Sequence, residues 1–167
     1  MSRMSDFILA PLTESDKVEV VDLFNHYVRT TFAAFLEDPV PYEFYDMLMQ
    51  AAHGYPAVST RDREGTLAGF GMLRPHTPLP AFAHTAEVTY FVRPDMTGRG
   101  IGTAMLRHLE EEGKKRGISA ILAHISSRNE GSIRFHQKNG FFEAGRFRAV
   151  GKKNGIVFDT VWMEKLV

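Results

Sequence analysis

The chain has 167 residues, of which 44% are hydrophobic and 24% charged, proportions that are typical of a globular protein and unlike those of disordered or fibrous chains. Twenty basic residues balance twenty acidic ones, which excludes an overall positive field able to hold nucleic acid or an anionic membrane surface. The lack of cysteine excludes disulfides and zinc–thiolate sites and fits a reducing compartment. We therefore expect one domain over residues 1–167, located in the cytoplasm, with no nucleic-acid or membrane partner.

The first half of the sequence predicts two helices among short strands. Apolar residues at helical spacing follow the side-chain acceptors of residues 13–16, and the proline at position 41 suits the first turn of a second helix. Short apolar runs on either side of residues 62–65 then indicate a hairpin. In chain order we expect a strand over 7–10, a helix that follows residues 13–16 and ends at Arg29, a helix from near Pro41 to Gly54, and strands over 57–60 and 66–73.

Prolines mark the middle of the chain. Residues 74–83 contain Pro75, Pro78 and Pro80, and at that density we expect a loop with no regular element. A β-branched and aromatic run, Val88–Val92, then predicts a strand. After it we expect a helix from Ile101 to Gly117, a buried strand over 118–125, a helix over 130–139, and strands over 141–150 and 156–165 joined by the turn at Asn154-Gly155.

The glycine-rich turn after Val92 is the most informative part of the sequence. It consists of Gly98, Arg99, Gly100, Ile101, Gly102 and Thr103. A strand, a turn and a helix in this order aim free backbone amides and the positive end of the helix dipole at one point, so an anion is expected there. Glycines let a bulky diphosphate approach the backbone, and the arginine can add a charge-assisted contact.

Spacing separates the phosphate-binding motifs that such a turn can represent. A dinucleotide fingerprint that starts at Gly98 needs a glycine where Thr103 stands, and an acidic residue about twenty positions further on, where the chain is apolar. A nucleotide P-loop needs Gly-Lys-Ser/Thr at the start of the helix, whereas Gly113-Lys114 lies at its end. Neither motif fits. A turn that merely connects a strand to a helix stays open as an alternative.

The turn resembles the coenzyme A-binding turn of the GNAT acetyltransferases, whose pattern is Gln or Arg, two residues, Gly, one residue, and Gly or Ala. Gly100 and Gly102 match this spacing, while Thr97 stands where Gln or Arg is usual. Residues 129–141, an asparagine followed by a helix and a Gly-Phe step, resemble the second GNAT signature. Most GNAT enzymes have tyrosine at the position of His136. The phosphinothricin and methionine sulfoximine acetyltransferase branch has histidine there, so the resemblance points to that branch.

Further matches to this branch span most of the chain. They are Asn25-His26-Tyr27, Glu87 within Thr85–Thr89, Val150–Lys153, Gly155 and Asp159. The branch usually has arginines before its glutamate to meet an acidic group of the substrate, but here only Arg74 lies between Leu73 and Glu87. Together with Phe82, the neighbouring Pro80 and Ala81 predict a more apolar substrate wall. The resemblance thus implies Arg74, Phe82 and Glu87 as substrate-binding residues.

The resemblance also implies acetyl-CoA as the acetyl donor and assigns residues to hold it. Backbone groups of Tyr90, Phe91 and Val92 would bind the pantetheine arm as a strand does. The turn from Gly98 to Thr103 would hold the diphosphate, Asn129 would contact the arm from the other side, and Lys138 would reach a phosphate. Tyr90 and Phe91 can at the same time be ordinary core side chains.

Acetyl transfer to an amine needs a neutral nitrogen and a proton for the departing thiolate. We expect Glu87 to remove the ammonium proton, directly or through water, although a carboxylate that only binds the ammonium uses the same geometry. We expect His136 to give a proton to the thiolate, and helix packing is its alternative role. The other histidines show no metal-ligand spacing, so no metal site is expected.

The sequence therefore predicts one α/β domain of the GNAT type, with a mixed central sheet of about seven strands and helices on both faces. The predicted reaction is transfer of an acetyl group from acetyl-CoA to the primary amine of a small molecule of the phosphinothricin or methionine sulfoximine type. A homodimer is expected from the resemblance to the branch. Two other functions stay open, a protein or peptide N-acetyltransferase and a non-catalytic acetyl-CoA sensor.

Overall fold

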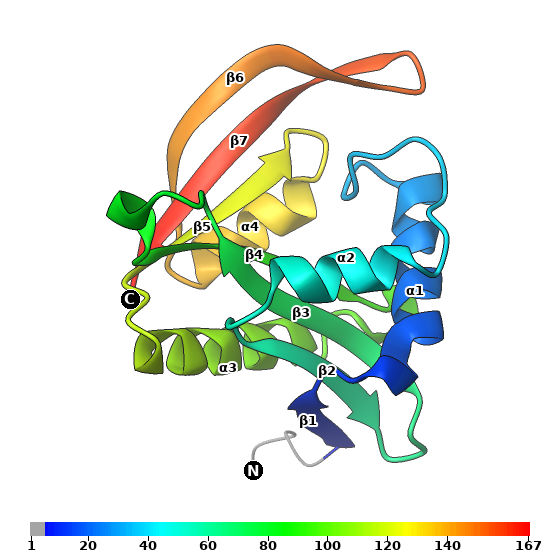
Figure 1. Ribbon diagram of the computed structural model, residues 1–167. Helices are drawn as coiled ribbons and strands as arrows, with labels where there is room; N and C mark the ends of the chain where they lie inside the picture. Colours follow the sequence, from blue (N-terminus) through cyan, green and yellow to red (C-terminus); the bar gives the residue numbers. More distant parts are fainter. Residues whose placement is uncertain (1–5) are drawn as a thin grey trace.

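The computed structural model describes residues 6–167, and one mixed sheet of seven strands runs through them in the order β1-β2-β3-β4-β5-β7-β6 (Figure 1). The pair β4–β5 is parallel and all other neighbouring strands are antiparallel. The strands are β1 Phe7–Pro11, β2 Ala57–Asp62, β3 Leu67–Pro75, β4 Thr85–Val92, β5 Ala120–Ser126, β6 Phe142–Lys153 and β7 Ile156–Leu166. The helices are α1 Lys17–Thr30, α2 Phe44–Ala51, α3 Ile101–Lys115 and α4 Glu130–Lys138.

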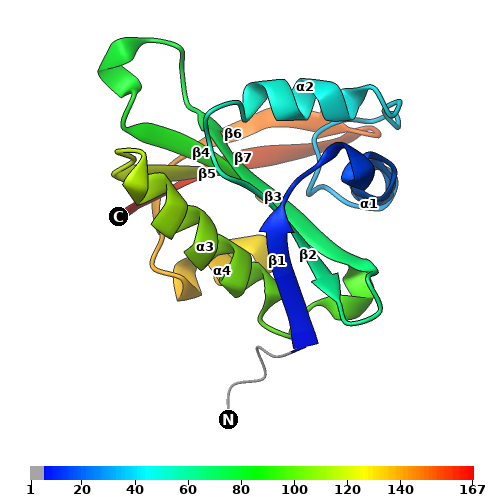
Figure 2. The ribbon, with the colours of Figure 1, turned by 60° about the horizontal axis from the view of Figure 1, so that its bottom comes forward.

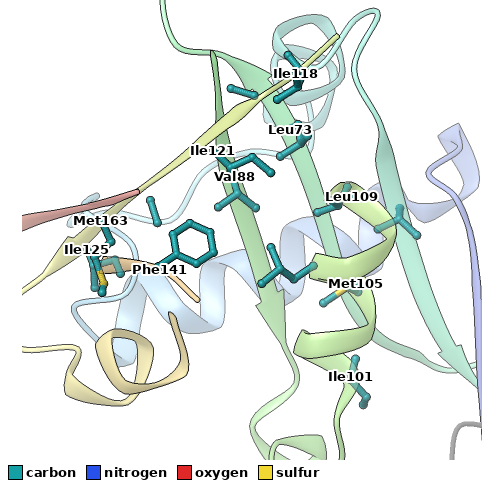
Figure 3. Packing of buried hydrophobic residues seen from close by; sticks show 14 of the residues in the cluster. Leu73, Val88, Ile101, Met105, Leu109, Ile118, Ile121, Ile125, Phe141 and Met163 are labelled. Atoms are coloured by element: carbon teal, nitrogen blue, oxygen red, sulfur yellow. The ribbon is translucent and has the colours of Figure 1, made fainter. Parts of the chain in front are cut away.

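Helices cover both faces of this sheet, as the sequence predicted. Figure 2 shows α1 and α2 on one face and α3 and α4 on the other. Each face has its own apolar core, and the alternation of β3 feeds both, because Met72 packs with α1 and α2 while Leu73 packs with α3. Figure 3 shows the second core, in which Met105 and Leu109 of α3 lie against β3 and β4. None of the helices formed by residues 6–167 is long and apolar enough to cross a membrane.

Two expectations about proline were wrong. The second helix begins at Phe44, because residues 41–43 form a turn whose first carbonyl, that of Pro41, accepts a hydrogen bond from the Phe44 amide. The proline-rich segment also keeps regular structure, since β3 continues to Pro75 and residues Pro80–Phe82 form a 3₁₀ turn. Pro75 lies beyond the end of β2, where its missing N–H costs no sheet hydrogen bond, and Pro80 occupies a first-turn position, which suits its fixed φ.

The hairpin of β6 and β7 extends beyond the rest of the sheet and arches over the α1 and α2 face (Figure 1). Its tip has the positive φ values of a tight hairpin turn, 51° at Asn154 and 79° at Gly155, as the Asn-Gly step predicted. The register shifts between Phe147 and Gly151. Asp159 of β7 secures this irregular stretch by accepting a hydrogen bond from the Ala149 amide at 2.8 Å, and this bond lowers the pKa of its carboxyl.

Gly151 is a further feature of the hairpin that packing explains. A Cβ built at this position would overlap the ring of Phe158 on β7, whereas a Cβ at Gly145 on the same strand would meet nothing within 4 Å. We predict that Gly151→Ala lowers the free energy of unfolding by about 1–3 kcal/mol, the usual cost of overpacking. Gly145→Ala is the matched control and should change it little. Urea unfolding measures both, and equal effects of the two changes would contradict the packing argument.

Candidate active site

The candidate site lies where β4 and β5 separate. The two strands pair only from Thr85 with Ala120 to Glu87 with Leu122, after which β4 continues to Val92 paired with β3 alone. β5 instead follows β7, and in Figure 3 Ile125 lies with Phe141 and Met163, away from Val88. One edge of β4 therefore has no neighbouring strand beyond Glu87. We call the space beside this unpaired edge, between β4 and β5, the opening.

The register of β4 decides which backbone groups face this opening. The Arg93 amide donates to the Ala68 carbonyl at 2.8 Å, so these two residues form a hydrogen-bonded pair with β3. Because such pairs alternate along antiparallel strands, Phe91 directs its amide and carbonyl to β3, while Tyr90 and Val92 direct theirs to the opening. This corrects the expectation that the Phe91 backbone binds pantetheine.

One of these backbone groups, the Val92 carbonyl, already has a hydrogen-bond partner. The hydroxyl of Tyr27 on α1 donates a hydrogen bond to the Val92 carbonyl. Burial raises the pKa of this hydroxyl, which therefore keeps its proton for the bond. The amide of Val92 and both backbone groups of Tyr90 remain directed at the opening. Tyr27, which is part of the Asn25-His26-Tyr27 match to the branch, thus contacts the unpaired edge of β4.

The glycine-rich turn lies at the far end of this opening. Gly98 and Gly100 have φ values of 75° and 83°, in the left-handed region that favours glycine, and Gly100 is the residue that precedes α3. Among residues 6–167, no side chain caps the amides of the first turn of α3. Gly102, the third glycine of the turn, is explained by packing, because a Cβ there would come within 3.2 Å of the Phe135 ring on α4. The turn therefore presents an exposed, uncapped helix start.

The remaining predicted coenzyme residues lie around this turn in different ways. Arg99 is exposed, and Thr97, which replaces the usual Gln or Arg, donates its hydroxyl to the Pro94 carbonyl at 3.1 Å. The half-buried Asn129 caps α4, where its Oδ1 accepts from the Ser132 amide at 3.3 Å. Lys138 is exposed at the end of α4. The cap on α4 explains the asparagine on structural grounds alone.

His136 is buried between α4 and β4. Its Nδ1 lies 2.7 Å from the Ser132 carbonyl, which can only accept, so Nδ1 carries a hydrogen. Burial lowers the pKa of the ring, which is therefore neutral, and Nε2 accepts the short hydrogen bond from the Tyr90 hydroxyl. In this state His136 has no free N–H to give to a thiolate. The structure thus favours the packing role that the sequence left open, and any proton donation would involve Tyr90.

Glu87 is the last residue of β4 that pairs with β5, so it lies at the vertex where the two strands separate. Its side chain is 11% exposed, and both carboxylate oxygens accept contacts, Oε1 from Arg74 at 3.1 Å and Oε2 from Nδ1 of His76 at 2.9 Å. Arg74 stands directly opposite Glu87 on β3, so it neutralises this carboxylate and is not a free guanidinium in a loop. His76 was not predicted as a site residue.

An aromatic wall continues from Glu87 across the same face of the sheet. His124 on β5 stacks on Trp162 of β7 with the ring centres 4.1 Å apart, and Phe35 of the α1–α2 loop lies 5.1 Å from His124. Burial lowers the pKa of His124. Phe82 lies on the other side, with its ring centre 6.0 Å from that of His76. Only Phe82 was predicted, because the sequence gives no local signal that strands β5 and β7 pair His124 with Trp162.

A lysine from the hairpin tip fixes the α1–α2 loop that carries Phe35. Lys153 is 2% exposed and its Nζ donates to the carbonyls of Thr31 at 2.7 Å and Ala34 at 2.8 Å. The neighbouring Asn154 amide donates to the Glu37 carboxylate at 2.7 Å. Burial lowers the pKa of Lys153, and the two carbonyls provide hydrogen-bond acceptors for its buried ammonium. The loop is thereby held over the aromatic wall.

Comparison with known proteins identifies the family. The model described as the acetyltransferase (GNAT) family matches residues 20–141. The chain belongs to the GNAT family. It is 33% identical over 159 residues to a phosphinothricin N-acetyltransferase from Streptomyces coelicolor, covering 93% of each chain. It is 30% identical to an L-methionine sulfoximine/L-methionine sulfone acetyltransferase from Pseudomonas aeruginosa, covering 90% of this chain and 88% of the relative.

Solved structures agree with this assignment. The crystal structure of a ribosomal-protein-alanine N-acetyltransferase from Brucella melitensis superposes with a TM-score of 0.89 and is 30% identical, covering 96% of this chain and 99% of that one. The protein is therefore a GNAT acetyltransferase, and acetyl-CoA is its acetyl donor. No cluster of acidic or histidine side chains among residues 6–167 is suited to hold a metal ion.

The residues of this GNAT enzyme fit acetyl-CoA. A strand-like pantetheine arm can hydrogen-bond to the unpaired edge at Tyr90 and Val92, and the uncapped amides after Gly100 can receive a diphosphate. When bound by these residues, the coenzyme would supply the acetyl thioester. Glu87 lies on the α1 and α2 face of the sheet, beside the unpaired edge of β4.

The neutral state of His136 predicts how stability depends on pH. The unfolded chain accepts a proton on this ring below its ordinary pKa of 6.5, whereas the folded ring, beside Tyr90, resists it. The unfolded state therefore binds more protons on acidification, and the free energy of unfolding should fall between about pH 7.5 and about pH 5.5. In His136→Gln this slope should be weaker. The exposed His53 provides the control His53→Gln, and a slope unchanged in His136→Gln but reduced in the control would refute the assignment.

Proposed function

We propose that the enzyme acetylates the primary amine of a small amino acid analogue of the phosphinothricin or methionine sulfoximine type. The observation that carries this proposal is the position of Glu87, which lies between the unpaired edge of β4 and the aromatic wall. There a carboxylate can attract a substrate ammonium, which must then lose a proton to a general base before it attacks the thioester. The names of the relatives at 33% and 30% identity support the same substrate class.

The wall favours a compact substrate with an uncharged side chain. Arg74 is paired with Glu87, which leaves less free positive charge for a phosphinate than a loop arginine would. Phe82, Trp162 and Phe35 instead present apolar surface and ring edges. Methionine sulfoximine and methionine sulfone therefore fit this side of the site better than phosphinothricin.

Most of the rate enhancement would come from placing the two reactants together. A well-oriented attack contributes on the order of 7–11 kcal/mol, whereas a single proton transfer contributes about a hundred- to ten thousand-fold in rate. The β4 edge and the glycine-rich turn fix the donor. The loop held by Lys153 limits the orientations open to the acceptor.

Peptide acetylation is the second candidate, and the name of the Brucella melitensis structure favours it. A peptide needs an open path for its backbone beyond the reacting amine. Here the β6–β7 hairpin and the α1–α2 loop are joined by Lys153 and Asn154 across the acceptor side. This closure favours a small molecule.

The proposal is tested by release of free thiol from acetyl-CoA with a panel of amines. We expect turnover with methionine sulfoximine and methionine sulfone, less with phosphinothricin, and little with polyamines or peptides that begin with alanine. A preference for the peptides would support the second candidate. Coenzyme binding without thiol release from any amine would instead support the sensor function.

We also propose that the protein is a cytoplasmic homodimer. The β6–β7 hairpin exposes large apolar side chains, among them Phe142, Phe147 and Val150 of β6 and Val157 of β7, and such surfaces commonly mark an interface. Light scattering of the purified protein should give twice the chain mass. A monomeric mass at working concentration would contradict the dimer.

A further inference from the structure

His76 is held in one tautomer and one orientation beside the acceptor site. Its amide donates to the Thr85 carbonyl at 3.4 Å, which continues the pairing of β3 and β4 beyond Pro75. Its Nδ1 lies 2.9 Å from Oε2 of Glu87. Since an ionised carboxylate can only accept a hydrogen bond, the hydrogen of the neutral ring lies on Nδ1 and the lone pair on Nε2.

Two aromatic side chains fix the ring of His76 in addition to the carboxylate. The ring centres of Phe82 and Trp162 lie 6.0 and 6.2 Å away, with interplanar angles of 75° and 82°. These contacts come from the 3₁₀ turn and from β7, two elements far apart in the sequence. The imidazole is therefore held in place by a carboxylate and by two aromatic rings.

The accessibility of the two groups differs in favour of the imidazole. The side chain of His76 is 29% exposed, and no described residue forms a hydrogen bond with its Nε2. Glu87 is 11% exposed, and both of its oxygens are engaged, one by Arg74 and one by His76. The Nε2 atom is therefore free of hydrogen bonds to described residues and available to an incoming ammonium, whereas each oxygen of Glu87 already accepts one contact.

We propose that His76 is the general base of the acetyl transfer and that Glu87, held by Arg74, positions it and stabilises its charged form. This proposal rests on the proposed function and refines it. One proton passes from the substrate ammonium to Nε2, which gives a neutral amine and an imidazolium paired with the Glu87 carboxylate. The amine nitrogen then bonds to the acetyl carbon as the carbon–sulfur bond breaks, and the electron pair leaves with the coenzyme thiolate. The second nitrogen proton neutralises that thiolate, and His76 returns its own proton to solvent.

The charges around His76 are known from every element packed against it. Glu87 from β4 contacts the ring, Arg74 from β3 pairs with the same carboxylate, and His124 from β5 stacks on Trp162, with its own pKa lowered by burial. No other charged side chain contacts the imidazole among the described residues. The pH dependence of the reaction should therefore change chiefly with His76 and Glu87.

Removal of the imidazole tests the proposal kinetically. In His76→Ala we expect kcat/KM to fall about a hundred- to ten thousand-fold, the range for loss of one general base. The acidic limb of the pH profile should disappear, and added imidazole should restore part of the turnover. Coenzyme A affinity and cooperative unfolding should be unchanged, and His53→Ala, at an exposed histidine of the α2 end, is the matched control.

Glu87→Gln separates the two possible bases. If Glu87 acts through His76, the double variant His76→Ala/Glu87→Gln should lose no more turnover than His76→Ala alone. If Glu87 is itself the base, His76→Ala keeps the acidic limb and gains nothing from imidazole, and Glu87→Gln has the larger effect. Either of these two results would overturn the proposal.

A measurement on the free protein keeps this test independent of the proposed function. Nitrogen-15 NMR of histidine-labelled protein should find the Nδ1–H tautomer at His76, and Glu87→Gln should shift the population toward Nε2–H. A dominant Nε2–H tautomer in the unsubstituted protein would overturn the proposal even if thiol release is normal. Conversely, failure of the amine panel with the expected tautomer present would contradict the proposed substrate class and not the pairing of His76 with Glu87.

Discussion

The separation of β4 from β5 after Glu87 and Leu122 is the constraint on which the site depends. Unpaired backbone groups on a buried strand are costly unless a partner satisfies them, and on β4 that partner can be a strand-like ligand. The same separation brings the end of the strand to the glycine-rich turn and leaves Glu87 at the vertex. The donor and acceptor sites are therefore two sides of one interruption in the sheet.

The acceptor side is assembled by long-range contacts, and a single buried ammonium holds much of it. Lys153 comes from the hairpin tip and donates to two carbonyls more than a hundred residues earlier in the chain. These two hydrogen bonds link the loop that carries Phe35 to the end of β6. The close packing of Phe158 against Gly151 and the bond from the Ala149 amide to Asp159 lie in the same hairpin, where the pairing of β6 and β7 shifts register.

The two histidines that flank β4 differ because their surroundings differ. His136 is buried, and its nitrogens are taken by Tyr90 and the Ser132 carbonyl, so its environment favours a neutral structural ring. His76 is partly exposed, with a carboxylate on one nitrogen and the other nitrogen free among the described residues. The sequence, through the family resemblance, led us to expect proton transfer at His136, with helix packing as the alternative. The geometry of the two sites favours proton transfer at His76 instead.

Wherever a short stretch of chain has its own conformational requirement, the sequence by itself determined the outcome. The left-handed φ values at Gly98 and Gly100, the Asn154-Gly155 turn and the order of strands and helices all follow from local propensity and periodicity. Only the tertiary structure decided which groups meet. The register of β3 and β4 turned Phe91 away from the opening and set Arg74 opposite Glu87, and the pairing of β5 with β7 joined His124 to Trp162. Such contacts depend on strand register across the sheet, and no local pattern in the chain encodes it.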